Sequence, residues 1–143
     1  MDKLTLSRIT AFAEADILSS MAKKVLAGKD LLILKKPEKT IVLLQVREPV
    51  KQSLFYLGEM LAVHCIVEVS GARGASILMG DDFSKAEAAA VLDAAHSGGF
   101  PEFELIEPEL LCLFEEKQKE NAKNTASIKE TQVSFHVLED RKF

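Results

Sequence analysis

One apolar alternation constrains the fold of this chain more than any other feature. Between residues 55 and 69, apolar side chains recur at odd-numbered positions, namely Phe55, Leu57, Leu61, Val63, Cys65, Val67 and Val69. Successive side chains of a β-strand point to opposite faces of the sheet, so this spacing predicts a strand with one apolar face. A straight strand of this length would span roughly 50 Å, too long for a small domain. We therefore expect a bend or bulge at Gly58-Glu59.

Three more strands are predicted around this one. Ser70-Gly71 has the composition of a tight turn, and residues 72–79 follow it, so the two segments form an expected antiparallel hairpin. Upstream, residues 31–34 and 41–46 are short and rich in aliphatic side chains. They are predicted as two separate strands, one before and one after Pro37, with a turn between them.

Helices are predicted on both sides of these strands. Apolar residues recur at helical spacing from Leu6 to Leu26, with a break near residues 13–16 that makes two helices. After Gly80, a helix is expected to begin at Asp82 or Ser84 and to run to about residue 96, with Ser84 and Glu87 as a capping box. The order of helices, then a β-meander, then helices predicts an α+β fold.

The end of the chain changes character. Pro108 suits the first turn of a final helix that carries Leu110 to Phe114, but residues 115–130 keep helix-forming residues without an apolar stripe. Beyond them, Val133, Phe135 and Val137 alternate as in a strand. We expect an α+β core domain over residues 1–114 and a helix and strand over residues 115–143. This tail either docks on a partner protein or packs on its own domain, and in the isolated protein it could pair with a second copy to make a homodimer.

Composition and charge exclude several classes of function. The chain has 143 residues, of which 48% are hydrophobic, and this fits one globular domain. Its net charge is −4 and it lacks a basic run with interleaved aromatic residues, which argues against nucleic acid as a partner. Its apolar stretches fall short of the ~20 residues that cross a bilayer, so no membrane association and a cytoplasmic location are expected. Cys65 and Cys112 are far apart, and both are expected to be reduced.

Four charged residues are candidates for chemistry, and each has a structural alternative. Asp81 and Asp82 could bind Mg²⁺, although acidic residues at a helix start more often cap free N–H groups. Arg73 lies in Gly71-Ala72-Arg73-Gly74, which could cradle a phosphate or form a tight hairpin. Glu59 interrupts the apolar row, so it is either a buried carboxylate with a shifted pKa or a solvent-facing residue at a bulge. Composition and spacing assemble no catalytic set or metal site from these residues.

A resemblance to a known family extends over most of the chain, about residues 4–138. The chain resembles the G subunit family of the carbon–phosphorus lyase system, PhnG, in the segments Gln45-Val-Arg-Glu-Pro-Val50, Phe55-Tyr-Leu-Gly-Glu-Met-Leu61, Val67-Glu-Val-Ser-Gly-Ala-Arg-Gly74, Gly80-Asp-Asp82, Ala90-Val-Leu-Asp-Ala-Ala95 and Thr131-Gln-Val-Ser-Phe135. It departs from the family pattern at Phe83, where members often have Pro, and at Ala75-Ser76, where Tyr-Gly is common. These departures concern local loop geometry and remove no evident catalytic group.

The resemblance implies a function that the residues alone do not give. It implies a non-catalytic subunit that binds the I subunit, together with the H and J subunits, in a cytoplasmic complex for phosphonate catabolism. The complex would use MgATP and methylphosphonate to make α-D-ribose 1-methylphosphonate 5-triphosphate, with this chain as an accessory subunit of that transferase and without a cofactor of its own. The alternative is an independent domain that binds or hydrolyses a phosphorylated small molecule through Glu59, Arg73, Asp81 and Asp82.

Overall fold

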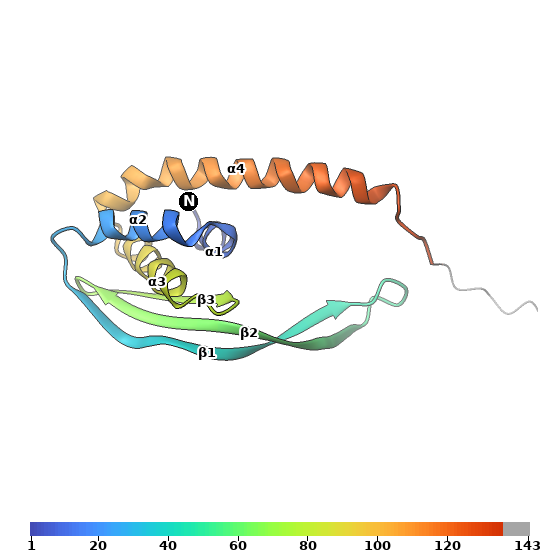
Figure 1. The fold of residues 1–143 in the computed structure, drawn as a ribbon, viewed down its shortest axis with the longest axis horizontal. Helices are drawn as coiled ribbons and strands as arrows, with labels where there is room; N and C mark the ends of the chain where they lie inside the picture. Colours follow the sequence, from blue (N-terminus) through green and yellow to red (C-terminus); the bar gives the residue numbers. More distant parts are fainter. Residues whose placement is uncertain (136–143) are drawn as a thin grey trace, which may run out of the picture.

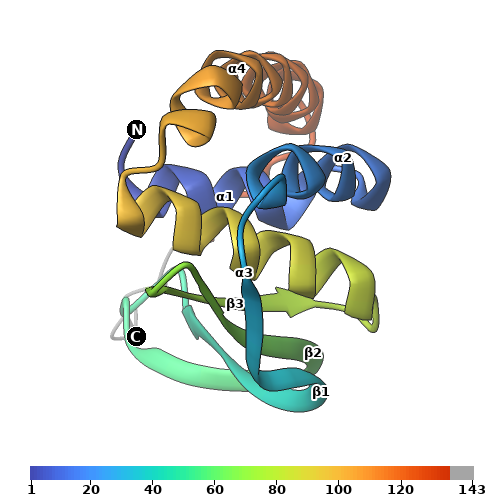
Figure 2. The same ribbon diagram turned by 90° about the vertical axis from the view of Figure 1, so that its left-hand side faces the viewer.

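The computed structural model describes residues 1–135 and confirms a mixed α+β fold. In chain order its elements are α1 (Lys3–Phe12), α2 (Ala15–Leu26), β1 (Leu31–Arg47), β2 (Leu54–Val69), β3 (Ala72–Met79), α3 (Phe83–Gly98) and α4 (Pro101–Lys129). The three strands form one antiparallel sheet in the order β1-β2-β3. All four helices lie over the same face of this sheet (Figures 1 and 2). None of the helices in residues 1–135 combines the length and apolar character of a bilayer span.

The helix α3 is the centre of the core. It lies directly on β2 and β3, while α1 and α2 cover its other side and α4 forms the outermost layer (Figure 2). Because it is enclosed from both sides, α3 is largely buried between Ala86 and Ala95, and most of its buried residues are alanines. On β2, the predicted alternation is confirmed from Val63 to Val69, where the odd-numbered side chains are buried under the helices.

The first half of β2 lacks the neighbours that cover its second half. The end of β3 pairs with Ala62, so beyond that point β1 and β2 continue as a two-stranded ribbon that projects from the core (Figure 1). We call this ribbon the arm and define it as residues 40–47 and 54–61, joined by the turn at residues 48–53. Residues of the predicted apolar row that lie in the arm, such as Phe55 and Leu57, are exposed.

The predicted irregularity near Gly58 is present. Leu44 pairs with Gly58 and Gln45 pairs with Tyr56, so the register skips Leu57. The bulge therefore lies one residue before the expected dipeptide. It lies within the arm, where an added residue can be accommodated without disturbing the packed part of the sheet.

The prediction of two separate strands at 31–34 and 41–46 is wrong. They are parts of the single strand β1, and Pro37 lies inside it. The register with β2 shifts before this proline, between Ile33 and Lys35, and again across it, between Lys35 and Glu38. A proline cannot donate to the sheet, but an edge strand with local bulges tolerates one.

The start predicted for the last helix also needs correction. The helix α4 begins at Pro101 rather than at Pro108, which lies inside it. Pro101 takes the first helical position, where a missing N–H costs nothing. The helix α3 begins at Phe83 with Asp82 as its N-cap, which confirms the first of its two expected starts, but Ser84 and Glu87 do not form the expected capping box.

The tail is described only in part. Its helix is the continuation of α4 to Lys129, and residues 132–135 form neither helix nor strand. Val137 lies outside the described residues. The terminal strand therefore stays a prediction.

Candidate functional site

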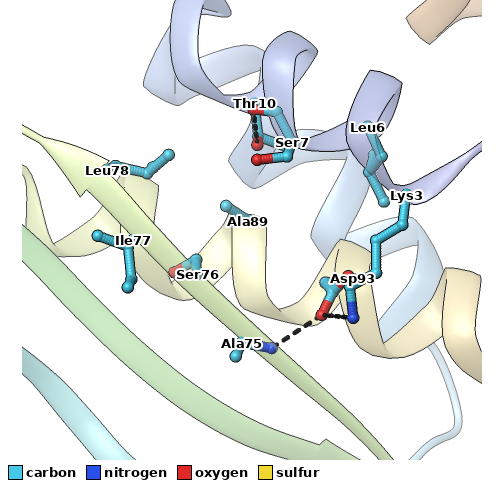
Figure 3. A pocket seen from close by; sticks show the side chains of 10 residues that line it. All are labelled: Lys3, Leu6, Ser7, Thr10, Ala75, Ser76, Ile77, Leu78, Ala89 and Asp93. Carbon is cyan, nitrogen blue, oxygen red and sulfur yellow. Dashed lines mark hydrogen bonds and ion pairs between the residues drawn. The ribbon is translucent and has the colours of Figure 1, made fainter. Parts of the chain in front are cut away.

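A polar pocket lies where α1, α3 and the outer edge of β3 meet (Figure 3). It encloses about 390 Å³, including space that is open to solvent. Its lining combines a cation, a carboxylate and three hydroxyl groups with apolar side chains, in the set Lys3, Leu6, Ser7, Thr10, Ala75, Ser76, Ile77, Leu78, Ala89 and Asp93. No sequence motif pointed to this pocket, because its residues come from three separate segments.

Asp93 is the central polar residue of the pocket. It is 7% exposed, and its Oδ2 accepts a hydrogen bond of 3.0 Å from the backbone N–H of Ala75. The Nζ atom of Lys3 lies 3.2 Å from the same oxygen (Figure 3). Asp93 thus joins α3 to the outer edge of β3 and to the start of α1. It also satisfies a donor on an edge strand that would otherwise be open to pairing with another chain.

Two of the three hydroxyl groups of the pocket are likewise engaged within the chain. Ser76 Oγ donates a 2.6 Å hydrogen bond to the carbonyl of Ala86 in α3, and Thr10 Oγ1 donates to the carbonyl of Ser7 at 3.0 Å. The lining contains neither His nor Cys. Among the lining residues, the arrangement therefore provides structural hydrogen bonds and no nucleophile beside a base.

We expect Asp93→Ala to destabilise the protein by about 1 kcal/mol, because it removes the acceptor of a partly buried hydrogen bond from the Ala75 N–H. Asp93→Asn keeps an acceptor oxygen of the same size and should cost less. Urea denaturation of both variants measures the difference. Equal stability of Asp93→Ala and the wild type would show that water satisfies Ala75 and that the contact has no structural role.

Asp81 and Asp82 lie at the junction between β3 and α3. Asp82 Oδ1 accepts a hydrogen bond of 2.9 Å from the backbone N–H of Lys85, which is the geometry of an N-cap. The structure thus gives Asp82 the capping role that was the alternative to Mg²⁺ binding. Asp81 is exposed beside it.

Arg73 lies at the other end of β3. It follows a two-residue turn in which Ser70 and Gly71 both have positive φ angles, 45° and 87°, as tight hairpins require. Its Nε atom is 3.2 Å from Oε2 of Glu68, its partner across the strands. Turn geometry therefore accounts for Gly71 without a bound phosphate. Because β3 separates Arg73 from Asp81, the structure does not bring these two candidates into one site.

Glu59 is on the arm, opposite Leu43, and it is exposed. This answers the question that the sequence left open. The carboxylate is in contact with solvent and is not a buried group inside an apolar row.

The cysteine and histidine side chains do not come together in one site. Burial raises the pKa of the Cys65 thiol to about 11, with a smaller contribution from Glu87, whereas Cys112 is exposed. The Nε2 atom of His64 is 3.9 Å from Glu38, and that of His96 is 2.8 Å from the carbonyl of Met1 at the start of the chain. Within residues 1–135, no three His, Cys, Asp or Glu side chains are placed to hold a metal ion.

Sequence reasoning missed Asp93 as a site residue. The signal was present, since it is a lone acidic residue within a run of alanines and aliphatic residues in α3. Such a residue is rarely buried without a partner.

Comparison with known proteins places the chain in a family. The family model described as "Phosphonate metabolism protein PhnG" matches residues 4–139, nearly the whole chain. No curated protein matches the chain in sequence.

Proposed function

The chain belongs to the PhnG family of phosphonate metabolism proteins, and we propose that it acts there as a non-catalytic subunit of the carbon–phosphorus lyase complex. In this proposal it binds the I subunit, with the H and J subunits in the same cytoplasmic complex. Its presence supports the I subunit in converting MgATP and methylphosphonate into α-D-ribose 1-methylphosphonate 5-triphosphate. It contributes surfaces for assembly rather than reacting groups.

The observation that supports this proposal is that the second half of α4 does not pack on its own domain. The helix spans 29 residues, but its buried residues, Phe103, Ile106 and Leu110, are all in the first third. Leu113 and Phe114 are half-buried against the core, and every described residue after Lys117 is exposed. The distal part of α4 therefore extends beyond its own domain (Figure 1).

A helix that is polar on all sides and leaves its domain has little to gain from folding alone. Binding of a second protein along this helix or at its end would explain why the helix is maintained. The following segment adds apolar anchors, since Val133 is 68% exposed and Phe135 is 70% exposed. Such side chains on an extended segment are suited to an edge strand or groove of a partner, where main-chain pairing gives affinity and side chains set the register.

The experiment that tests the function compares reaction mixtures with and without this chain. Purified complex subunits are incubated with MgATP and methylphosphonate, and products are followed by ³¹P nuclear magnetic resonance and by adenine release. We expect the ribose phosphonate product to be lost when this chain is omitted and restored when it is added back. The purified chain alone should release no adenine. Turnover by the chain alone would contradict the subunit role and favour an independent enzyme.

A further inference from the structure

The arm has a face that continues the core-facing side of the sheet but has no helix over it. Residues directly opposite each other in an antiparallel pair share a face, and Lys39 lies opposite Val63, which is buried under the helices. The next two pairs on this face belong to the arm and follow without a register shift. We call Lys39 and these two pairs, Ile41 with Leu61 and Leu43 with Glu59, the inner face of the arm.

The aliphatic side chains of the inner face are open to solvent. Ile41, Leu43 and Leu61 are 62%, 54% and 45% exposed, whereas Val63, the next residue of the same row on β2, is fully buried. Contiguous exposed apolar side chains in soluble proteins generally mark an interaction site. A two-stranded ribbon is also marginally stable in water by itself, so it gains stability when its apolar side is covered. The inner face therefore has the features of a docking surface.

The packed half of the same sheet face shows which kind of element covers it. There the odd-numbered side chains of β2 lie under α3, which packs directly on the strands. A further strand at the free edge of the arm would pair with backbone groups of β2, but it would leave the side chains of Ile41 and Leu61 in solvent. A helix laid on the inner face buries them and extends the layer of α3 beyond the core.

The charges of the inner face indicate what such a helix carries. Lys39 at the base of the arm and Glu59 toward its tip are both exposed, and neither belongs to an ion pair within residues 1–135. Their levels differ by four residues along the strands, which is roughly 13 Å. This is slightly more than two turns of a helix. A complementary helix therefore has an apolar stripe flanked by an acidic and a basic residue about seven or eight positions apart.

We propose that the inner face of the arm binds an amphipathic helix of the I subunit, whose apolar stripe covers Ile41, Leu43 and Leu61. The arm and the distal part of α4 project from the core toward the same end of the molecule, so a partner that binds the tail is within reach of the arm (Figure 1). The two contacts act together, and loss of either weakens the complex. This inference rests on the proposed function, because that function supplies the partner.

Co-purification with a tagged I subunit tests this surface against a matched control. Ile41→Lys places a charge at the centre of the inner face, and Ile77→Lys places one on the opposite face of the sheet, where Ile77 is 64% exposed. We expect Ile41→Lys to lower the amount of complex about tenfold or more, and Ile77→Lys to leave it unchanged. Far-UV circular dichroism confirms that both variants are folded.

The wild-type chain separates the two levels of the proposal. If it binds the I subunit and the two variants bind equally, the inner face is not the contact, and the inference is wrong while the proposed function stands. If the wild-type chain does not bind the I subunit, the proposed function is wrong as well.

Thiol labelling gives a second measurement that does not depend on an introduced charge. In a Cys112→Ser background, Ile41→Cys and Ile77→Cys each place an exposed thiol on one face of the sheet, since Cys65 is buried. An excess of the I subunit should largely block maleimide labelling of Ile41→Cys and leave that of Ile77→Cys unchanged. If residues 54–61 instead become protected from hydrogen exchange while Ile41→Cys still reacts, then a strand pairs at the edge of β2 and the helix is wrong.

Discussion

Replacing Gly74 by alanine is expected to destabilise the folded domain by about 3 kcal/mol, because a methyl group at this position has no space. An ideal Cβ on Gly74 would lie 2.1 Å from the carbonyl oxygen of Ala90 and 2.3 Å from the backbone nitrogen of Ala94. Both atoms belong to the backbone of α3, so no side-chain rotation relieves the clash. The helix has to move away from β3, and this loosens the contact on which the core is built. Urea denaturation measures the loss.

Gly58→Ala is the matched control for this substitution. Gly58 lies on the neighbouring strand β2, and a Cβ there meets no atom within 4 Å. Its replacement should change stability by less than about 0.5 kcal/mol. If Gly74→Ala is as mild as Gly58→Ala, then α3 can shift on the sheet at little cost, and the close packing of helix and strand is not what stabilises this fold.

The periodicity of the sequence predicted which face of β2 is apolar, but it did not predict what covers that face. Val63 and Val69 are buried because α3 and the helices above it lie over them, whereas Leu61 belongs to the same row and is exposed. A period of two residues reports only the direction of side chains. How far the helix layer extends depends on the lengths of the other elements and on how they pack.

Prolines were a second source of difference between prediction and structure. Pro37 was expected to lie between two strands, yet β1 continues through it because an edge position leaves one side of the backbone free. Pro108 was expected to start a helix, but Pro101 does so and Pro108 lies within α4. Local sequence contains candidates for both roles, and tertiary context selects between them.

Parts of the site were predictable to different degrees. The capping role of Asp82 follows from its position before a helix, which is local information. The role of Asp93 depends on contact with Ala75 on another element, and this contact exists only because Gly74 allows α3 to approach β3. Local patterns contain no information about such a contact between distant segments. The resemblance to a family is what connected the chain as a whole with phosphonate metabolism.

Ending the chain after Phe114 should abolish its co-purification with the I subunit while leaving the remaining domain folded. The buried residues of α4 precede this point, and the removed residues that the structure describes are exposed except for half-buried Lys117. Little apolar surface is therefore lost from the core, and the midpoint of thermal unfolding should stay within a few degrees of that of the full chain. Co-expression with a tagged I subunit, followed by affinity purification, measures the binding.

A second truncation after Glu130 separates the two parts of the tail. It keeps the distal part of α4 and removes residues 131–143, which include Val133, Phe135 and Val137. Loss of binding in both truncations assigns the contact to the terminal segment, and loss only in the shorter chain assigns it to the helix. If the chain ending at Phe114 still binds the I subunit, the docking role of the tail is wrong, and if that chain unfolds, the tail belongs to its own core.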